Sequence, residues 1–303
     1  MSGLLVVELR RFLVRRLVRA VAVLVMVGIV IAGIATLAKS HRSDAGALEA
    51  QARADRDRIV AECISGRFGP PTEALPPGQS REEFCRSVVT SEPNDPRFHL
   101  MSLVDVFKGT TVPLVLLAWV LSASFIGAEW HAGTVTTLLT WEPRRIRVLV
   151  AKVAVCMVLA FVGTVAIQAL LLGALTPAAV LRGTTEGVNG AWLRELSGVV
   201  LGGGALAAIG AGIRFSIASV ARGTAAALGA GFGYLLVVEQ LIGAVRQGWR
   251  SWFLVWNAAV LVNGHRLAGD IPRSLAEAAL LLSLYAAGAV VVAIGAFRTR
   301  DVT

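Results

Sequence analysis

Long apolar runs alternate with polar segments along the whole chain. Each apolar run holds roughly 20 residues with almost no charge, which is enough for a helix to cross the ~30 Å hydrocarbon core of a membrane. The pattern predicts six transmembrane helices, over residues 20–38, 106–128, 148–175, 196–213, 224–245 and 276–297. The predicted fold class is therefore an all-α integral membrane protein, with residues 20–303 as its transmembrane domain.

Three polar segments between these runs are long enough to carry structure of their own. Residues 39–105 form the longest, with a helical pattern in its first part and several prolines later. Residues 129–147 form a shorter, charged connection. Residues 246–273 hold three closely spaced tryptophans, which are typical of a membrane interface and predict short helices at the outer surface. A seventh span in this last segment is the alternative, and it would reverse the side of the C-terminus.

Composition favours a membrane protein over a soluble all-helical core. The chain has 303 residues, of which 55% are hydrophobic and 16% are charged, and its mean hydropathy is +0.69. A soluble protein of ordinary composition carries about 25% charged residues. The shortage of charge is what a chain surrounded by lipid requires.

The positive charges predict the orientation, since short cytoplasmic segments are enriched in Lys and Arg. The net charge is +9, and residues 1–19 alternate apolar and basic positions, which predicts an amphipathic helix on the cytoplasmic surface. A cleaved signal peptide is the alternative, but the following apolar run is long and has no clear cleavage site. With six spans both termini are cytoplasmic, residues 39–105 are extracytoplasmic, and the expected location is the cell membrane.

Cysteine placement bears on the outer segment. Cys63 and Cys85 lie in residues 39–105, and Cys156 lies in an apolar run. Disulfides persist outside the cytoplasm, so a Cys63–Cys85 disulfide is the favoured prediction and two free thiols are the alternative.

No motif for catalysis or metal binding is found. The sequence lacks a P-loop, so ATP binding through that motif is not expected here. Glu129 and His131 resemble part of a zinc-protease motif, but the second histidine one helical turn later is missing. We therefore predict no catalytic residue, no metal site and no cofactor on this chain. Glycines four residues apart predict close helix packing instead, at Gly198, Gly202, Gly229 and Gly233.

One ionisable residue, Glu239, lies clearly within a predicted span, with Gln240 beside it. A charge inside a membrane is costly and usually faces the bundle interior or water. Two interpretations stay open. The pair is either a polar point on a substrate path or in helix packing, or a contact with water and headgroups near the outer end of the span.

The connection 129–147 contains a short amphipathic helix by its pattern. Val135, Leu138 and Leu139 share one face, Thr134 is a candidate N-cap, and Pro143 ends the helix. The segment either binds lipid headgroups or docks on a cytoplasmic partner.

This connection resembles the cytoplasmic signature of type-2 ABC transporter permeases. That signature has an acidic residue, Gly-Thr, a Leu-Leu-Thr stretch, Pro, basic residues and a Lys that enters the third span. The basic start, the six spans and the short outer helices before the last span agree with the family. The residues that fit the signature are Glu129, Gly133, Thr134, Leu138, Leu139, Thr140, Pro143, Arg144, Arg145 and Lys152.

The resemblance implies the membrane subunit of an ATP-driven exporter, which is not itself an enzyme. Two permease chains, identical or sister, would form the substrate pathway. Two separate ATPase subunits would hold ATP and Mg, and would receive residues 134–141 as a coupling helix. Glu129, Arg144 and Arg145 would fix its register by charge-assisted bonds.

The long outer segment departs from the simplest members of the family and leaves the substrate open. Two other classes of function remain. One is a secondary transporter or channel that needs no partner, for which Glu239 is the only intramembrane candidate. The other is a membrane scaffold or sensor with a disulfide-linked outer loop.

Overall fold

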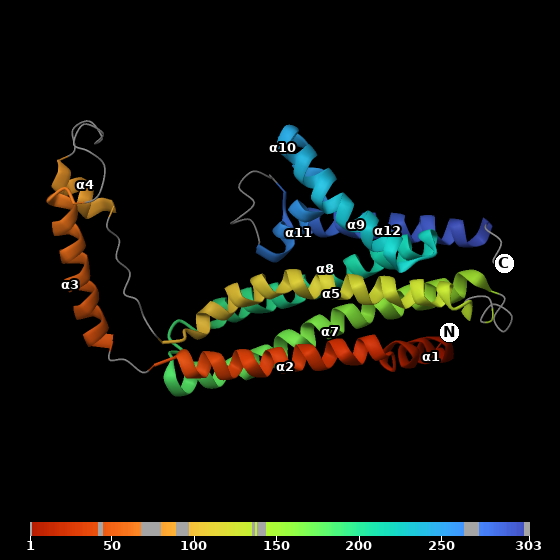
Figure 1. Ribbon diagram of the computed structural model, residues 1–303, viewed down its shortest axis with the longest axis horizontal. Helices are drawn as coiled ribbons and strands as arrows, with labels where there is room; N and C mark the ends of the chain where they lie inside the picture. Colours follow the sequence, from red (N-terminus) through yellow and green to blue (C-terminus); the bar gives the residue numbers. More distant parts are fainter. Residues whose placement is uncertain are drawn as a thin grey trace. The chain divides into compact units, whose positions relative to one another are not determined.

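In the computed structural model, the secondary structure of the described ranges is helical, with short turns between helices and one isolated parallel bridge between His99 and Thr184 (Figure 1). The chain divides into two compact units, which are described separately below. The described residues are 2–41, 45–67, 80–88, 97–134, 137, 144–263 and 273–299.

Six helices of the described ranges are long and apolar enough to cross a membrane, as the sequence predicted. This confirms an all-helical architecture compatible with a multi-pass membrane protein, while the side on which each terminus lies stays a prediction. The spans are α2 (Arg16–Lys39), α5 (Leu103–His131) with η2 (Leu100–Ser102) before it, α7 (Arg145–Arg182), α8 (Gly190–Ala221), the continuous run of α9 (Thr224–Gly233), η3 (Tyr234–Ile242) and α10 (Gly243–Val245), and α12 (Leu275–Thr299).

Two predicted boundaries were wrong. The N-terminal helix α1 (Ser2–Leu13) ends well before residue 19, and the first span begins already at Arg16. The fourth span runs on to Ala221, where the sequence predicted a loop from residue 214. Its polar residues suggested exposure, but they are buried, and the Ser216 hydroxyl donates to the Gly212 carbonyl at 2.8 Å.

Short helices were correctly predicted after the fifth span. They are η4 (Gln247–Trp252) and α11 (Leu254–Asn263). With ten residues, α11 is too short to cross a bilayer as a helix, which argues against a seventh span in the described part of this segment. Residues 264–272 lie outside the described ranges.

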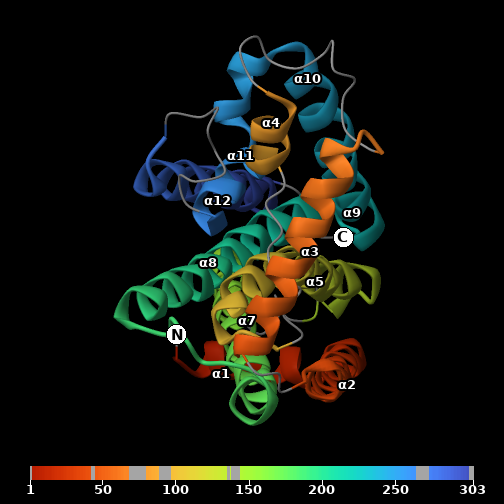
Figure 2. The same ribbon diagram turned by 90° about the vertical axis from the view of Figure 1, so that its left-hand side faces the viewer.

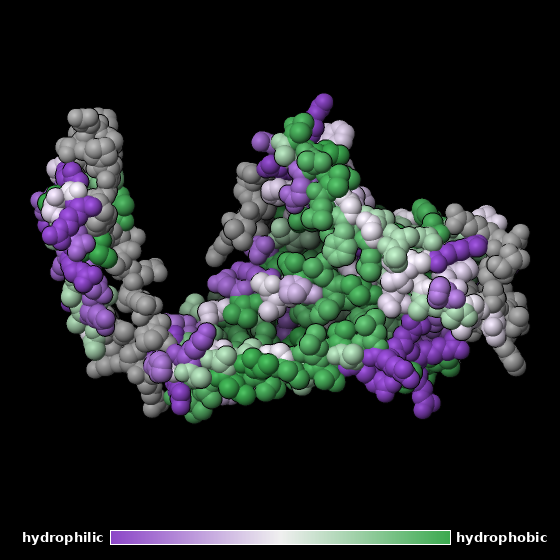
Figure 3. Space-filling model, in the orientation of Figure 1, coloured by the Kyte–Doolittle hydropathy of each residue, from purple (hydrophilic) through white to green (hydrophobic). Residues whose placement is uncertain are grey.

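The larger unit is built around α5 and α8, which lie side by side, with α12 packed on α8 (Figures 1 and 2). Ser122 of α5 donates a hydrogen bond of 2.7 Å to the Ala211 carbonyl of α8, and Phe125 and Phe215 meet in the core. Hydrophobic side chains cover much of the visible face of these helices, whereas a hydrophilic patch lies over α1 (Figure 3). Both features suit helices immersed in lipid with a charged end.

Helix packing uses only one of the four predicted glycines, Gly202, and also uses glycines that were not predicted. A Cβ atom added to Gly198, Gly229 or Gly233 would meet open space, whereas close approaches occur at Gly210 and Gly231. At Gly202 the expected contact is present, because an added Cβ would lie 2.9 Å from the Leu261 carbonyl oxygen.

The smaller unit contains α3 (Ala45–Ile64) and α4 (Arg81–Val88), which a Cys63–Cys85 disulfide joins. The structure thus has the disulfide that the sequence favoured. At the start of α4, Glu83 accepts hydrogen bonds from the backbone and hydroxyl of Ser80, the arrangement of a capping box. These bonds to the ionised form lower the pKa of Glu83 below its ordinary value of 4.5.

Candidate functional site

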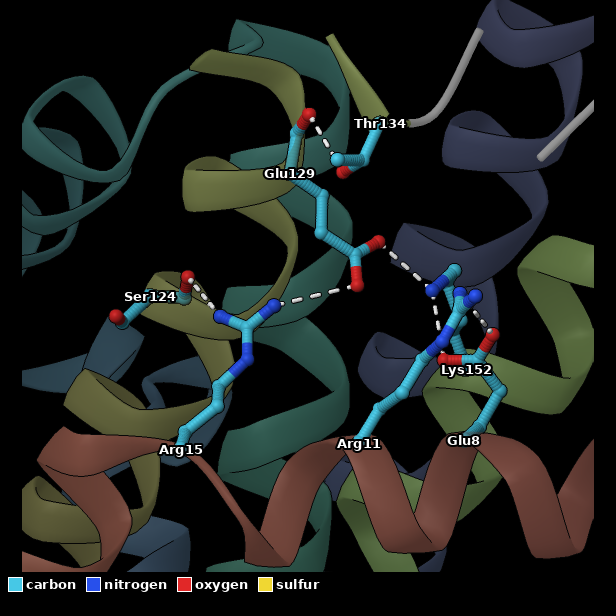
Figure 4. A network of polar contacts seen from close by, with 7 residues as sticks. All are labelled: Glu8, Arg11, Arg15, Ser124, Glu129, Thr134 and Lys152. Atoms are coloured by element: carbon cyan, nitrogen blue, oxygen red, sulfur yellow. Dashed lines mark hydrogen bonds and ion pairs between the residues drawn. The ribbon is translucent and has the colours of Figure 1, made fainter. Parts of the chain in front are cut away.

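A buried charge network joins α1, α5 and α7 (Figure 4). Glu8 comes from the middle of α1, Glu129 from the last turn of α5, and Lys152 from two turns into α7. The Lys152 ammonium lies between the two carboxylates, 2.7 Å from an oxygen of each. All three residues are buried, with Glu8 and Lys152 no more than 1% exposed.

Two arginines surround this centre. Arg15, in the break between α1 and α2, donates to Glu129 Oε1 at 3.2 Å and to the Ser124 carbonyl at 3.1 Å. Arg11 lies 3.5 Å from Glu8 Oε1, which makes an ion pair but no hydrogen bond in the described structure. Two carboxylates thus meet three cations, one of which, Arg11, is half exposed.

An aromatic wall closes the network on one side. The Phe125 ring lies 4.4 Å from the Arg15 guanidinium carbon and 5.0 Å from Lys152 Nζ. Phe12 packs against the same ring, with a centroid distance of 5.2 Å. Cations over an aromatic face gain more when water is excluded, so the wall stabilises the buried charges.

Burying several charges stabilises a fold only when each has partners. A matched buried set can be nearly neutral overall, but removing one member strands the rest at a cost of about 3–5 kcal/mol. The network therefore fixes α1, α5 and α7 to each other near the ends of the 132–144 connection. It holds the two helices that flank this connection at one defined distance.

The sequence named Glu129 and Lys152 separately and missed Glu8 and Arg15 as members of one site. The sequence did contain a distinguishing feature for each member of the Glu8–Lys152 pair. Glu8 is the single acid among the first 43 residues, and Lys152 is the single lysine of α7. What the sequence could not supply is the fold that brings positions 144 residues apart to 2.7 Å.

The burial of Glu129 argues against its predicted direct contact with a partner. The residue is 7% exposed, and its carboxylate is held by Arg15 and Lys152. A carboxylate enclosed in this way has no oxygen left to fix the register of a docking partner. Glu129 instead anchors the end of α5 inside the chain.

The remaining predicted docking residues lie on both sides of a gap in the described chain. Gly133 has a positive φ of +65°, which suits glycine, and the Thr134 hydroxyl donates to the Glu129 carbonyl at 3.3 Å. The Arg144 carbonyl accepts the backbone N–H of Arg147 at 2.9 Å as α7 begins with Arg145. Three of the predicted docking residues lie outside the described residues or have undescribed side chains, namely Val135, Leu138 and Leu139, and so does the predicted stop, Pro143.

Glu239 has a structural role that the sequence left open. It is 2% exposed and accepts hydrogen bonds from the backbone N–H groups of Leu254, at 2.8 Å, and Val255, at 2.9 Å. These are the first residues of α11, so the carboxylate caps that helix. Gln240 is exposed and does not share the site.

No metal centre is found among the described residues, since they hold no group of three or more His, Cys, Asp or Glu able to bind an ion. No protein-family model matches this sequence, and a search of curated proteins found no match. The features that bear on function are the six apolar helices, the charge network and the sequence of the 132–144 connection.

Proposed function

We propose that this chain is the membrane permease subunit of an ATP-driven exporter of the type-2 ABC class. The observation that carries the proposal is the buried network at the two ends of the 132–144 connection. Glu129 precedes the connection, Lys152 follows it, and their side chains are 2.7 Å apart. A force applied to the connection would reach α5 and α7 together, as a mechanical input from a motor requires.

In the proposed mechanism, residues 134–141 bind in a groove on a separate ATPase subunit, which holds ATP and Mg. Nucleotide-driven closure of the ATPases displaces this segment. Because Lys152 also pairs with Glu8, the N-terminal helix α1 moves with the same rigid base. Helix α5 then transmits the displacement to α8, on which it packs along the core.

Two such chains, identical or sister, would enclose the substrate pathway. The chain supplies no catalytic residue in this scheme, and hydrolysis takes place on the partner. Export as the direction, and the cell membrane as the location, follow from the resemblance of residues 129–152 to the permease signature.

Affinity purification from native membranes tests the proposal. We expect the tagged chain to bring down an ATPase whose P-loop peptide is found by mass spectrometry. Leu138→Asp should abolish this association, because it places a charge on the predicted docking face. Thr137→Asp adds the same charge one residue away on the opposite predicted face and should retain it.

A purification that brings down no ATPase would favour another class of function. The disulfide-linked α3 and α4 support a scaffold or sensor as the second candidate, since they belong to a separate compact unit that a disulfide stabilises. Purification without any ATPase would favour that candidate. A partner-independent secondary transporter has less support, because the Glu239 carboxylate is occupied by backbone groups.

A further inference from the structure

A second candidate site lies in the same unit, apart from the residues of the charge network. It is a partly open cavity of about 240 Å³ between α5, α8, η3, α11 and α12. Its walls are almost entirely apolar, with Val115, Ile213, Leu254 and Leu282 among the lining residues. A cavity of this size is larger than the ~150 Å³ that holds a benzene molecule and smaller than the ~300 Å³ usual for drug-sized ligands.

One wall of the cavity carries a buried cation, Arg214 of α8, which is 3% exposed. Its guanidinium carbon lies 4.0 Å from the Trp119 ring, and its Nη1 donates to the Ala227 carbonyl at 3.3 Å. Its Nε has no acceptor within the described part of the chain, and neither has Nε1 of Trp119, which lines the same cavity. No acidic side chain of the described residues forms an ion pair with Arg214.

The fold makes room for this cation at two glycines. A Cβ atom at Gly210 would overlap the Trp119 indole, and one at Gly231 would overlap the Arg214 guanidinium. A buried arginine without a carboxylate is costly in an apolar surrounding, and a cation–π contact offsets only part of that cost. Such an arrangement is what a site for an external anion requires.

The opposite end of the cavity is already neutralised. Lys108 lies 3.2 Å from Glu195 and 3.9 Å from Asp105. On α5, Lys108 and Trp119 are eleven residues apart, a rise of about 16 Å along a helix. An anion entering this elongated space would be attracted to the Arg214 end and would find apolar walls along the rest.

We propose that this cavity binds a single-chain amphipathic anion, whose carboxylate pairs with Arg214 and whose alkyl chain lies among the apolar walls. The volume suits a ligand of roughly a dozen non-hydrogen atoms. The idea that such an anion is a ligand of a transport subunit rests on the proposed function. Binding of the anion to the cavity needs no ATPase.

Fluorescence quenching tests the site in the full-length chain, reconstituted in phosphatidylcholine nanodiscs. The probe is 2-bromodecanoate, whose bromine is next to the carboxylate and would lie beside Trp119. We expect saturable quenching that disappears in Trp119→Phe and that decanoate, but not decanol, reverses. Arg214→Gln should weaken binding about 10- to 100-fold, because a charge-assisted hydrogen bond is lost, and Arg214→Lys should restore part of it.

A second variant keeps the test decisive if Arg214→Gln does not fold. Ala259 lines the cavity, and Ala259→Phe should abolish saturable quenching by filling the space for the alkyl chain. Unsaturable quenching, equal competition by decanol, or unchanged binding in either variant would overturn the proposal. If the wild-type chain shows no saturable ligand binding but retains ATPase association, this inference alone is overturned. Saturable binding without ATPase association would reject only the proposed function.

Discussion

Two buried cations, Lys152 and Arg214, are accommodated in opposite ways by this fold. Lys152 lies between two carboxylates that come from different helices. Arg214 is similarly buried but contacts an aromatic ring and a backbone carbonyl, without an acidic partner among the described residues. The first cation is fully matched within the chain and fixes helices. The second is left with unused hydrogen-bonding capacity beside a cavity, and is suited to bind something else.

The largest predicted effect is at the matched cation. Lys152→Met should lower the free energy of unfolding by about 3–5 kcal/mol, because two buried carboxylates lose their shared partner. Unfolding followed by SDS titration measures the loss. Adding Glu8→Gln to Lys152→Met should recover part of it, since one stranded charge is removed. A loss no greater than that of an exposed ion pair, about 0–1 kcal/mol, would contradict a structural lock.

The unmatched cation should respond much less. Arg214→Met removes a cation–π contact but also removes a buried charge, so the change in unfolding free energy should stay within about 1 kcal/mol. The same SDS titration gives the comparison directly. If Arg214→Met destabilises the chain as strongly as Lys152→Met does, Arg214 has a structural partner and the contrast between the two cations fails.

Substitution of glycine around Arg214 tests how tightly the cation is held. Gly231→Ala places a methyl group where the guanidinium lies and should cost about 1–3 kcal/mol by overpacking. Gly233→Ala is the matched control, because nothing surrounds its Cβ position, and it should be neutral or stabilise by up to about 1 kcal/mol. Equal effects of the two variants in thermal unfolding would show that Arg214 moves freely.

The smallest effect is expected at an exposed carboxylate, Glu83. Its pKa is lowered by hydrogen bonds from Ser80, so its contribution to α4 is present above pH 4.5 and is lost as the pH falls through its folded pKa. Protection of the first-turn amides of α4 from hydrogen exchange, taken as the intrinsic rate divided by the observed rate at the same pH, should fall over that acidic window. Glu83→Gln should largely remove this change. Protection that falls equally in the variant would assign the effect to another group.

The six long apolar helices of the described ranges could be predicted from the sequence, because runs of about 20 residues with almost no charge are visible in it. The Cys63–Cys85 disulfide could also be predicted, since the two cysteines share one polar segment. The C-terminal end of α8 could not be predicted, because the sequence places Arg214 at the membrane interface. Only the fold shows that Trp119 and Gly231 surround it. Its place depends on packing between helices distant in sequence.

The charge network shows the same limit. Sequence patterns marked Glu129 and Lys152 as parts of a signature, but they assigned Glu129 to a partner. Only the fold shows that Arg15 and Lys152 hold its carboxylate, and that Glu8 shares Lys152 with it. Likewise, the sequence left open whether Glu239 lines a pathway, packs helices or meets water and headgroups, whereas in the fold its oxygens cap a short helix fifteen residues later.

Photo-cross-linking from position 139 in native membranes tests directly whether residues 134–141 bind a separate ATPase subunit. With benzoylphenylalanine in place of Leu139, we expect a cross-link to a protein containing a P-loop ATPase peptide. The same group in place of Thr137 should give little or none, because that position is on the opposite predicted face. Cross-linking to lipid alone, or equally from both positions, would contradict the account and leave the segment as a membrane-surface helix.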